Sequence, residues 1–162
     1  MSAPLWQRAW QRPAAVLTAV AVVSVAAVGA ALVSQYQFGM EPCPWCILQR
    51  LIFLVIALAC LVGLASRRIA GTLVLLLSLC GMAAALWQHF KAAASSSCAM
   101  TVADKIVSAV KLDSLWPEVF LPRASCSDAA VSLWGVPYDF WSLALFIVIS
   151  LAGWQVMRSR AA

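Results

Sequence analysis

Hydrophobic residues fall into four long runs along the chain, and polar residues gather between them. The runs cover residues 14–33, 47–65, 69–88 and 140–157. Arg50 is the single charged residue inside them. A membrane crossing needs about 20 mainly apolar residues, because the hydrocarbon core is about 30 Å thick and a helix rises about 1.5 Å per residue. The pattern therefore predicts an all-α membrane protein, a four-transmembrane-helix bundle that forms a single integral membrane domain over residues 1–162.

The first run also shares features with a secretory signal peptide, because it follows Arg8 and Arg12 and ends among small residues. A signal peptide has a hydrophobic stretch of about 7 to 15 residues. The run here is longer, and three more runs follow it. We therefore expect a retained membrane anchor.

Two polar segments between the runs are long enough to form loops, at residues 34–46 and 89–139. In the longer one, Val102, Ile106 and Val110 recur at a spacing of four, while Asp104 falls on another side of the helical wheel. This spacing predicts a short amphipathic helix that lies on the membrane. A solvated linker turn is the alternative interpretation.

The composition excludes two classes of protein. The chain is 64% hydrophobic and 10% charged, against roughly 45–50% and 25% in a soluble domain. A soluble monomer has no way to bury so much apolar surface, and a disordered chain is poor in such residues. The chain contains eleven Lys and Arg but only six Asp and Glu. In a membrane protein such an excess of basic residues usually indicates which loops lie in the cytoplasm. We therefore expect no nucleic-acid partner.

The charges predict which loops share a side of the membrane. The two tails and the turn between the second and third runs contain arginines and no acidic residue. These arginines are Arg8, Arg12, Arg67, Arg68, Arg158 and Arg160. The carboxylates all lie in the other two loops, at Glu41, Asp104, Asp113, Glu118, Asp128 and Asp139. Basic loops stay in the cytoplasm, so both termini are expected to be cytoplasmic, with loops 34–46 and 89–139 on the outer, non-cytoplasmic side.

Four of the six cysteines fall on that outer side. Cys43 and Cys46 form a Cys-Pro-Trp-Cys motif at the mouth of the second run, and Cys98 and Cys126 lie in the long loop. The remaining two, Cys60 and Cys80, lie within hydrophobic runs. Buried cysteines of this kind usually act as small hydrophobic side chains, and no function is assigned to them.

Three interpretations of the outer cysteines compete. A Cys98–Cys126 disulfide would staple the loop and remove about 3 to 4 kcal/mol of unfolded-state entropy, but it leaves the Cys-Pro-Trp-Cys motif unexplained. A zinc site fits poorly, because structural zinc sites draw on close cysteine pairs and 27 residues separate Cys98 from Cys126. A redox relay explains both pairs, since a two-residue spacing is typical of redox centres. A non-catalytic, disulfide-stapled membrane scaffold stays the alternative.

The residues around Cys46 favour the relay. Pro42 and Pro44 predict that the second helix begins near Cys46, which would leave that sulfur close to unpaired backbone N–H groups. Arg50 lies one helical turn further on. An arginine in the hydrocarbon costs up to roughly 2.5 to 3.5 kcal/mol at mid-bilayer, so we expect it to face Cys46 and an electron acceptor. A membrane anchor that reaches the interface is the alternative for this arginine.

The sequence also limits the acceptor. It contains no nucleotide-binding glycine pattern, haem attachment motif or iron–sulfur spacing. A quinone dissolved in the membrane is the remaining natural acceptor for the two electrons of a thiol pair. His89, the only histidine, ends the third run on the same side. It either lines the quinone site or is solvated at the interface.

Three stretches resemble the disulfide bond formation protein B family, DsbB. They are Glu-Pro-Cys-Pro-Trp-Cys-Ile-Leu-Gln-Arg at 41–50, Pro-Glu-Val-Phe at 117–120 ahead of Cys126, and Gly-Val-Pro with Trp-Ser-Leu at 135–143. The resemblance runs from about residue 14 to 157. It implies a quinone-dependent thiol oxidase of the bacterial inner membrane. Such an enzyme reoxidises a periplasmic thioredoxin-fold oxidase of the DsbA type and passes the electrons to ubiquinone or menaquinone.

The same resemblance implies a role for each outer cysteine. Cys98 would form the mixed disulfide with the partner, and Cys126 would resolve it. The electrons would then pass to the Cys43 and Cys46 pair through a transient Cys43–Cys126 bridge, and the Cys46 thiolate would face the quinone.

Arg50 matches the quinone-site arginine of the family. His89 matches only by its position near the end of the third span. No metal is implied.

Overall fold

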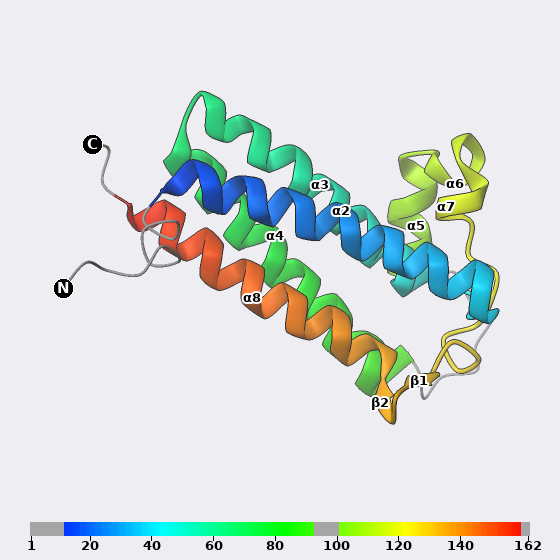
Figure 1. Cartoon of the computed structure of the whole chain (residues 1–162). Coiled ribbons are helices and arrows are strands. Elements are labelled where there is room, and N and C mark those ends of the chain that lie inside the picture. The colour runs from blue at the N-terminus through cyan, green and yellow to red at the C-terminus, as the bar shows by residue number, and fades with distance from the viewer. Residues whose placement is uncertain (1–11, 93–100, 160–162) are drawn as a thin grey trace.

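The computed structural model describes residues 12–92 and 101–159. Four long helices run side by side as a bundle, and each is apolar enough to cross a membrane (Figure 1). They are α2 (Pro13–Phe38), α3 (Pro44–Leu61), α4 (Arg67–Trp87) and α8 (Tyr138–Arg158). The predicted four-helix, all-α architecture is confirmed.

Prolines and glycines decide where the helices begin and end. Proline stands at the first position of α2 and α3, where its fixed φ suits a helix and its missing N–H costs nothing. Gly39 ends α2 in a left-handed conformation with φ of 65°, which glycine adopts without strain. α2 continues to Phe38, beyond the predicted boundary at residue 33, and α3 ends at Leu61 rather than at residue 65.

Short turns extend two of the four helices. The 3₁₀ turn η1 (Val62–Leu64) follows α3, and the π-helical turn η2 (Gln88–Ala92) follows α4. π-helical turns are rare and frequently occur at functional sites. η2 contains His89 and leads into residues 93–100, which lie outside the described part of the chain.

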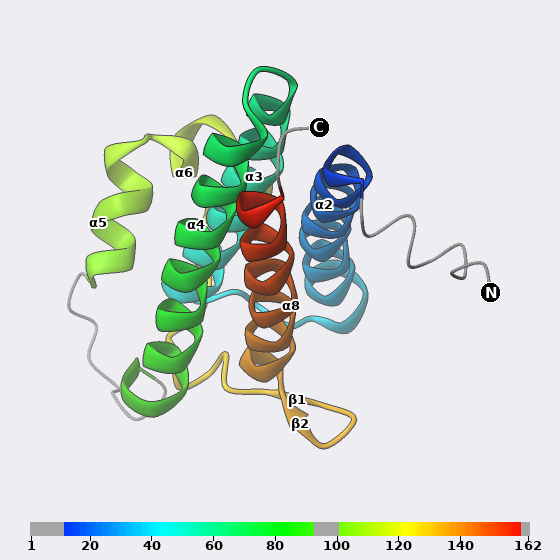
Figure 2. The same cartoon turned by 90° about the vertical axis from the view of Figure 1, so that its left-hand side faces the viewer.

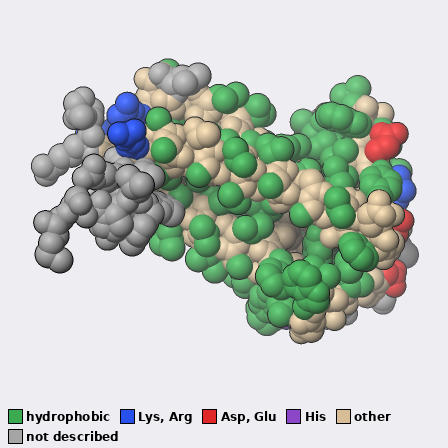
Figure 3. All heavy atoms as spheres, viewed as in Figure 1, with side chains coloured by type: hydrophobic (Ala, Val, Ile, Leu, Met, Phe, Trp, Pro, Cys, Tyr) green, Lys and Arg blue, Asp and Glu red, His purple; other side chains and the backbone are tan. Residues whose placement is uncertain are grey.

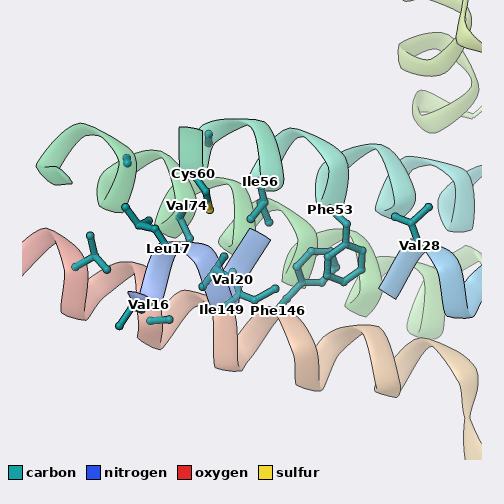
Figure 4. Packing of buried hydrophobic residues seen from close by; sticks show 14 residues of the cluster. Val16, Leu17, Val20, Val28, Phe53, Ile56, Cys60, Val74, Phe146 and Ile149 are labelled. Carbon is teal, nitrogen blue, oxygen red and sulfur yellow. The ribbon is translucent and has the colours of Figure 1, made fainter. Parts of the chain in front are cut away.

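The hydrophobic core lies along the middle of the bundle (Figure 4). Ile56, Val74 and Ile149 are almost fully buried, and they come from α3, α4 and α8. The rings of Phe53 and Phe146 stack with their centroids 4.2 Å apart and an interplanar angle of 7°. Offset-stacked aromatic pairs of this kind add about 0.5–1.5 kcal/mol beyond burial, and this one joins α3 to α8.

Glycines allow α4 and α8 to pack closely. A Cβ at Gly71 would lie 2.6 Å from the backbone nitrogen of Met157, and one at Gly153 would lie 2.9 Å from the backbone nitrogen of Leu75. A Cβ at Gly81 would overlap the ring of Phe146. Small residues drive helix association in membranes, because hydrocarbon offers no hydrophobic gain for burying large ones.

The long loop folds against one end of the bundle. It contains α5 (Val102–Ala109), α6 (Leu112–Leu115), α7 (Pro117–Phe120) and a hairpin of β1 (Ser132–Leu133) and β2 (Val136–Pro137). Figure 2 shows α5 and α6 beside the bundle and the hairpin below the start of α8. All these elements therefore lie near the outer end of α3, where the Cys-Pro-Trp-Cys motif is.

The predicted amphipathic helix is confirmed as α5. A capping box between Thr101 and Asp104 fixes its start. Val107 is buried in a cluster with Ile47 of α3, while Val102 and Ile106 are exposed. The helix thus has one apolar side on the bundle and another turned outward. Its placement on the membrane stays a prediction.

The acidic side chains gather at one end of the bundle. Figure 3 shows Lys and Arg at the end where α2 begins, whereas the other end carries Asp and Glu together with Lys or Arg. Arg67, Arg68 and Arg158 start or finish helices at the basic end. The first described residue of α2 and the last of α8 share that end (Figure 1). Arg8 and Arg160 lie outside the described residues, and the cytoplasmic orientation stays a prediction.

The close packing of α4 on α8 can be tested by adding single methyl groups. Gly71→Ala should lower the free energy of unfolding by about 1–3 kcal/mol, because the new Cβ has no room. Gly29→Ala in α2 is the matched control, since nothing lies within 4 Å of its Cβ position. The control should leave stability unchanged or raise it by about 0.5–1 kcal/mol. Thermal unfolding in detergent measures both, and a Gly71→Ala protein as stable as wild type would contradict the packing.

Candidate active site

The start of α3 brings together three of the predicted site cysteines. Cys43 is the N-cap residue of α3, and Cys46 lies in the first turn. The carbonyl oxygen of Pro42 accepts hydrogen bonds from the backbone N–H groups of Arg123 and Ala124, at 2.9 and 3.3 Å. These bonds hold the segment before Cys126 against the start of α3. The two cysteines of the Cys-Pro-Trp-Cys motif and a third from the long loop therefore meet.

Cys43 lies between the other two sulfurs. Its Sγ is 3.1 Å from the Sγ of Cys46 and also makes a side-chain hydrogen bond with Cys126. All three are free thiols in the structure. Cys43 is 0% exposed and packs in one cluster with Cys126, Ala92 and Ala129. A soluble thiol therefore has no direct access to Cys43.

The hydrogen bond between Cys43 and Cys126 shifts the pKa values of the two thiols in opposite directions. The hydrogen bond to Cys126 raises the pKa of Cys43 far above the ordinary value of a thiol, and the bond with Cys46 and burial act in the same direction. The same hydrogen bond from Cys43 lowers the pKa of Cys126. Cys43 therefore keeps its proton, and Cys126 is the better thiolate of this pair.

The structure corrects one expectation about Cys46. The helix begins at Pro44, before the predicted start near Cys46. The Sγ of Cys43, not that of Cys46, therefore accepts the N–H of Cys46, at 3.4 Å. The Sγ of Cys46 accepts a hydrogen bond from Nε2 of Gln88 at 3.3 Å. Nε2 of Gln49 donates to Oε1 of Gln88 at 2.7 Å, which orients that amide toward the sulfur.

Arg50 is buried inside the protein. It is 5% exposed, which favours a role inside the bundle over an anchor that reaches the interface. Its Nη1 donates to Oε1 of Gln35 at 2.8 Å and to the carbonyl oxygen of Val119 at 3.0 Å, and its Nη2 donates to the carbonyl oxygen of Ala31 at 3.3 Å. Hydrogen bonds to described residues thus use three of the five N–H groups of a guanidinium. No other described residue accepts a hydrogen bond from the remaining two, which leaves them available to a ligand.

A cavity of about 260 Å³ opens beside Cys46 and Arg50. α2 and α8 separate toward this end of the bundle (Figure 1), and the cavity lies between their outer parts and α3. Its lining is mostly apolar, with Ala27, Phe53 and Leu145 among the lining residues. Several polar groups converge on it, among them Cys46, Gln49, Arg50, Gln88, Tyr138 and Asp139. Small-ligand sites combine these features, at volumes upward of roughly 300 Å³.

His89 does not line this cavity among the described residues. Its Nδ1 lies 2.8 Å from Oδ2 of Asp139, the second residue of α8, and Asp139 does line the cavity. The ring of His89 also packs on that of Phe140, with centroids 4.5 Å apart. The predicted contact of His89 with a ligand stays a prediction, and the structure adds Asp139 between the histidine and the cavity.

Comparison with known proteins decides the family. A sequence profile described as "Disulfide bond formation protein DsbB" matches residues 12–156. The chain belongs to the DsbB family. It is 33% identical over 141 residues to "Disulfide bond formation protein B" of Herminiimonas arsenicoxydans, which covers 84% of this chain and 89% of the relative. It is 34% identical over 143 residues to "Disulfide bond formation protein B 1" of Pseudomonas savastanoi pv. phaseolicola, which covers 83% of each.

Membership in the DsbB family agrees with the rest of the molecule. DsbB is a bacterial membrane family, and the four apolar helices fit a multi-pass membrane protein. The family name assigns the chain to disulfide bond formation, for which the clustered thiols are the appropriate chemistry. Cys98, the fourth predicted site cysteine of this DsbB protein, lies outside the described residues.

Sequence reasoning missed four polar residues of this DsbB site. Gln35 binds Arg50, Gln49 and Gln88 position a hydrogen bond on Cys46, and Asp139 joins His89 to the cavity. Gln49 and Gln88 lie inside the predicted hydrophobic runs. A polar residue in a membrane span usually faces the bundle interior and marks a functional site, so this signal was present for both glutamines.

The hydrogen bond between Cys43 and Cys126 predicts a pH effect. A thiolate and not a thiol reacts with iodoacetamide, and the lowered pKa of Cys126 keeps it reactive as the pH falls. In Cys43→Ala the bond is lost, so the midpoint of the pH–rate profile for Cys126 alkylation should move to higher pH. Mass spectrometry of the reduced protein follows the Cys126 peptide. Cys60→Ala, which removes a thiol from the mid-bundle core, should leave the profile unchanged, and an unmoved midpoint in Cys43→Ala would refute the assignment.

Proposed function

We propose that this protein is a quinone-dependent membrane thiol oxidase, a thiol:quinone oxidoreductase that reoxidises a periplasmic thioredoxin-fold oxidase of the DsbA type. The observation that supports it best is the order of contacts at the site. Cys126 contacts Cys43, Cys43 contacts Cys46, and Cys46 lines the cavity beside Arg50. Electrons that enter at the long loop can therefore reach the cavity by exchange between neighbouring sulfurs.

The thiols divide the reaction into two exchanges. The reduced partner attacks a Cys98–Cys126 disulfide at Cys98, and its second thiol then displaces Cys98, so that the partner leaves oxidised. The Cys126 thiolate next attacks a Cys43–Cys46 disulfide at Cys43 and releases Cys46. Cys98 then attacks Cys126, which frees Cys43 and restores the loop disulfide. Each cycle moves two electrons from the partner to the Cys43 and Cys46 pair.

The acid–base properties of the sulfurs suit this order. Exchange requires a thiolate as the attacking group, and a thiolate of lowered pKa leaves more readily. The pKa of Cys126 is lowered by its hydrogen bond with Cys43, which favours Cys126 as the attacking group. Gln88 donates a hydrogen bond to Cys46, the sulfur that is released.

The residues around the cavity fit a quinone headgroup. Its ring is apolar on both faces and carries carbonyl oxygens that accept hydrogen bonds, and the cavity offers apolar walls with the free N–H groups of Arg50. When bound, a ubiquinone or menaquinone would supply the two-electron acceptor. Arg50 would hold a carbonyl oxygen and stabilise negative charge there, while Phe53 and Leu145 would exclude water from the ring.

A membrane quinone also suits the energetics of the partner. The reduction potential of DsbA is about −120 mV, against about −270 mV for thioredoxin, so its reoxidation needs a strong terminal acceptor. The cavity lies between α2 and α8, two helices with the length and composition of membrane spans. A lipid-soluble acceptor can reach such a site without leaving the membrane. We place the site on the periplasmic side of the bacterial inner membrane, in agreement with the charge distribution.

The proposed activity is tested by quinone reduction without oxygen. The purified protein, given a reduced DsbA-type oxidase and ubiquinone-1, should reduce one quinone for each pair of partner thiols, followed by the loss of quinone absorbance. Cys46→Ser should abolish turnover, because the sulfur next to the cavity is gone. Cys60→Ser, the control near the end of α3 that is far from the Cys-Pro-Trp-Cys motif, should turn over normally. If the wild-type protein reduces neither ubiquinone-1 nor a menaquinone analogue, the proposal is rejected.

The partner step separates the oxidase from a disulfide-stapled scaffold. Cys126→Ser, which keeps Cys98, should form a covalent adduct with the disulfide form of the DsbA-type oxidase. The Cys98 thiolate attacks the partner's disulfide and releases one partner thiol, and the adduct persists because Cys126 is not there to resolve it. The adduct should appear on a non-reducing gel and vanish with reductant. Adding Cys98→Ser should prevent it. A scaffold without catalysis forms no such adduct, so its absence at Cys126→Ser would favour that alternative.

A further inference from the structure

The proposed reaction moves protons as well as electrons. Oxidation of the Cys43 and Cys46 thiols to a disulfide releases two electrons and two protons, and reduction of a quinone to its hydroquinone consumes two of each. Sulfur passes the electrons directly to the acceptor. The protons must be delivered to the oxygen atoms of the acceptor inside the cavity, whose walls are mostly apolar. The site therefore needs a group that gives protons to the cavity and recovers them from water.

Asp139 has the position that such a group requires. It is 9% exposed and is the second residue of α8, from which it lines the cavity. A buried carboxyl group is costly unless it has a partner. The partner of Asp139 is His89, whose Nδ1 lies 2.8 Å from Oδ2.

His89 connects this carboxyl group to water. Its side chain is 31% exposed, whereas that of Asp139 is 10% exposed. The histidine lies in η2, at the outer end of the bundle, and it is not among the residues that line the cavity. An imidazole accepts a proton at one nitrogen while it gives one from the other, so the pair forms a continuous path from solvent to the cavity.

The other titratable groups around the cavity are less suited to this role. Arg50 does not release its proton in proteins. The hydroxyl group of Tyr138 donates to Ser34 at 3.4 Å. Glu41 lines the same cavity, but it is exposed to solvent and has no histidine beside it among the described residues. Asp139 is thus the single buried carboxyl group that lines the cavity in the described part of the chain.

We propose that Asp139 donates protons to the acceptor bound in this cavity and that His89, acting through Asp139, reloads it from periplasmic water. This inference rests on the proposed function and assigns it a proton path. For each acceptor reduced, Asp139 gives two protons in succession, and each is replaced through His89. The two thiols release two protons to solution, which equal the two protons that His89 takes up from it. Asp139 is then a catalytic residue, and His89 is a relay and positioning residue.

The test compares Asp139→Asn, His89→Gln and Asp113→Asn in the full-length protein in nanodiscs. Asp113 is the matched control, because it lies in α6 and does not line the cavity. Asparagine keeps the size and a hydrogen-bond donor at position 139 but has no proton to transfer. In single turnovers of the reduced protein at saturating ubiquinone-1, Asp139→Asn should reduce the quinone roughly 100-fold more slowly, a typical contribution of a general acid. His89→Gln should also slow it, and the double variant should be no slower than Asp139→Asn, because the two residues act as a unit. Asp113→Asn should stay within about twofold of wild type.

Two further readouts separate proton transfer from a structural role. Affinity for ubiquinone-1, from quenching of tryptophan fluorescence in the disulfide form, should change by no more than about twofold in Asp139→Asn. His89 is the only histidine, so ¹⁵N-histidine labelling gives one imidazole. Its resonances should shift when ubiquinone-1 binds to the wild-type disulfide form and should stay unmoved in Asp139→Asn. Formate should partly restore the single-turnover rate of Asp139→Ala, because a small acid can fill the vacated space.

The outcomes distinguish the two proposals. Wild-type turnover together with an undiminished single-turnover rate in Asp139→Asn overturns the proton path and leaves the oxidase standing. Loss of quinone affinity in Asp139→Asn with a normal rate at saturation overturns it as well, because Asp139 would then only bind the ligand. A wild-type protein that reduces no quinone overturns both.

Discussion

The buried guanidinium of Arg50 is the constraint around which this end of the bundle is arranged. A cation in an apolar span costs several kcal/mol unless its N–H groups are satisfied, and no carboxylate is hydrogen-bonded to this one among the described residues. Instead, the guanidinium donates hydrogen bonds to backbone carbonyl oxygens of α2 and α7 and to the side-chain amide oxygen of Gln35. α2 must therefore extend past the apolar run to carry Gln35, and α7 must fold back onto α3. Both requirements shape the cavity beside Cys46.

The helices were predictable from the sequence because the membrane imposes a fixed length and composition on each span. The reactive residues were predictable by type, since Cys43, Cys46 and Arg50 are chemically distinctive in an apolar chain. Their hydrogen-bond partners were not, because partners depend on how each helix is rotated. Gln88 meets Cys46 from a helix 42 residues away in the sequence. Asp139 meets His89 across 50 residues, and no pattern along the chain links them.

The start of α3 shows how a small shift in a boundary changes the chemistry. Both prolines were recognised as helix-limiting, but Pro44 is the first residue of the helix and not the last residue before it. Cys43 thus becomes the N-cap, and its sulfur accepts the free N–H. The sulfur in the helical turn is left to a side-chain donor. Helix boundaries vary by one or two residues even between methods of assignment. A shift of two residues is enough here to decide whether Cys43 or Cys46 accepts the backbone N–H at the start of the helix.

The groups that donate hydrogen bonds or positive charge near Cys46 differ in chemistry from the pair formed by His89 and Asp139. Gln88 gives Cys46 a hydrogen bond from an amide, which can support a thiolate but has no proton to surrender to it. Arg50 adds positive charge and likewise gives up no proton to the sulfur, because a guanidinium stays protonated in proteins. In the proposed reaction the groups that exchange protons with water are His89 and Asp139, and neither is hydrogen-bonded to Cys46 among the described residues. A reaction that needs a charged Cys46 sulfur and a protonated oxygen nearby requires this division of roles, since an acid hydrogen-bonded to Cys46 would protonate the thiolate that passes on the electrons.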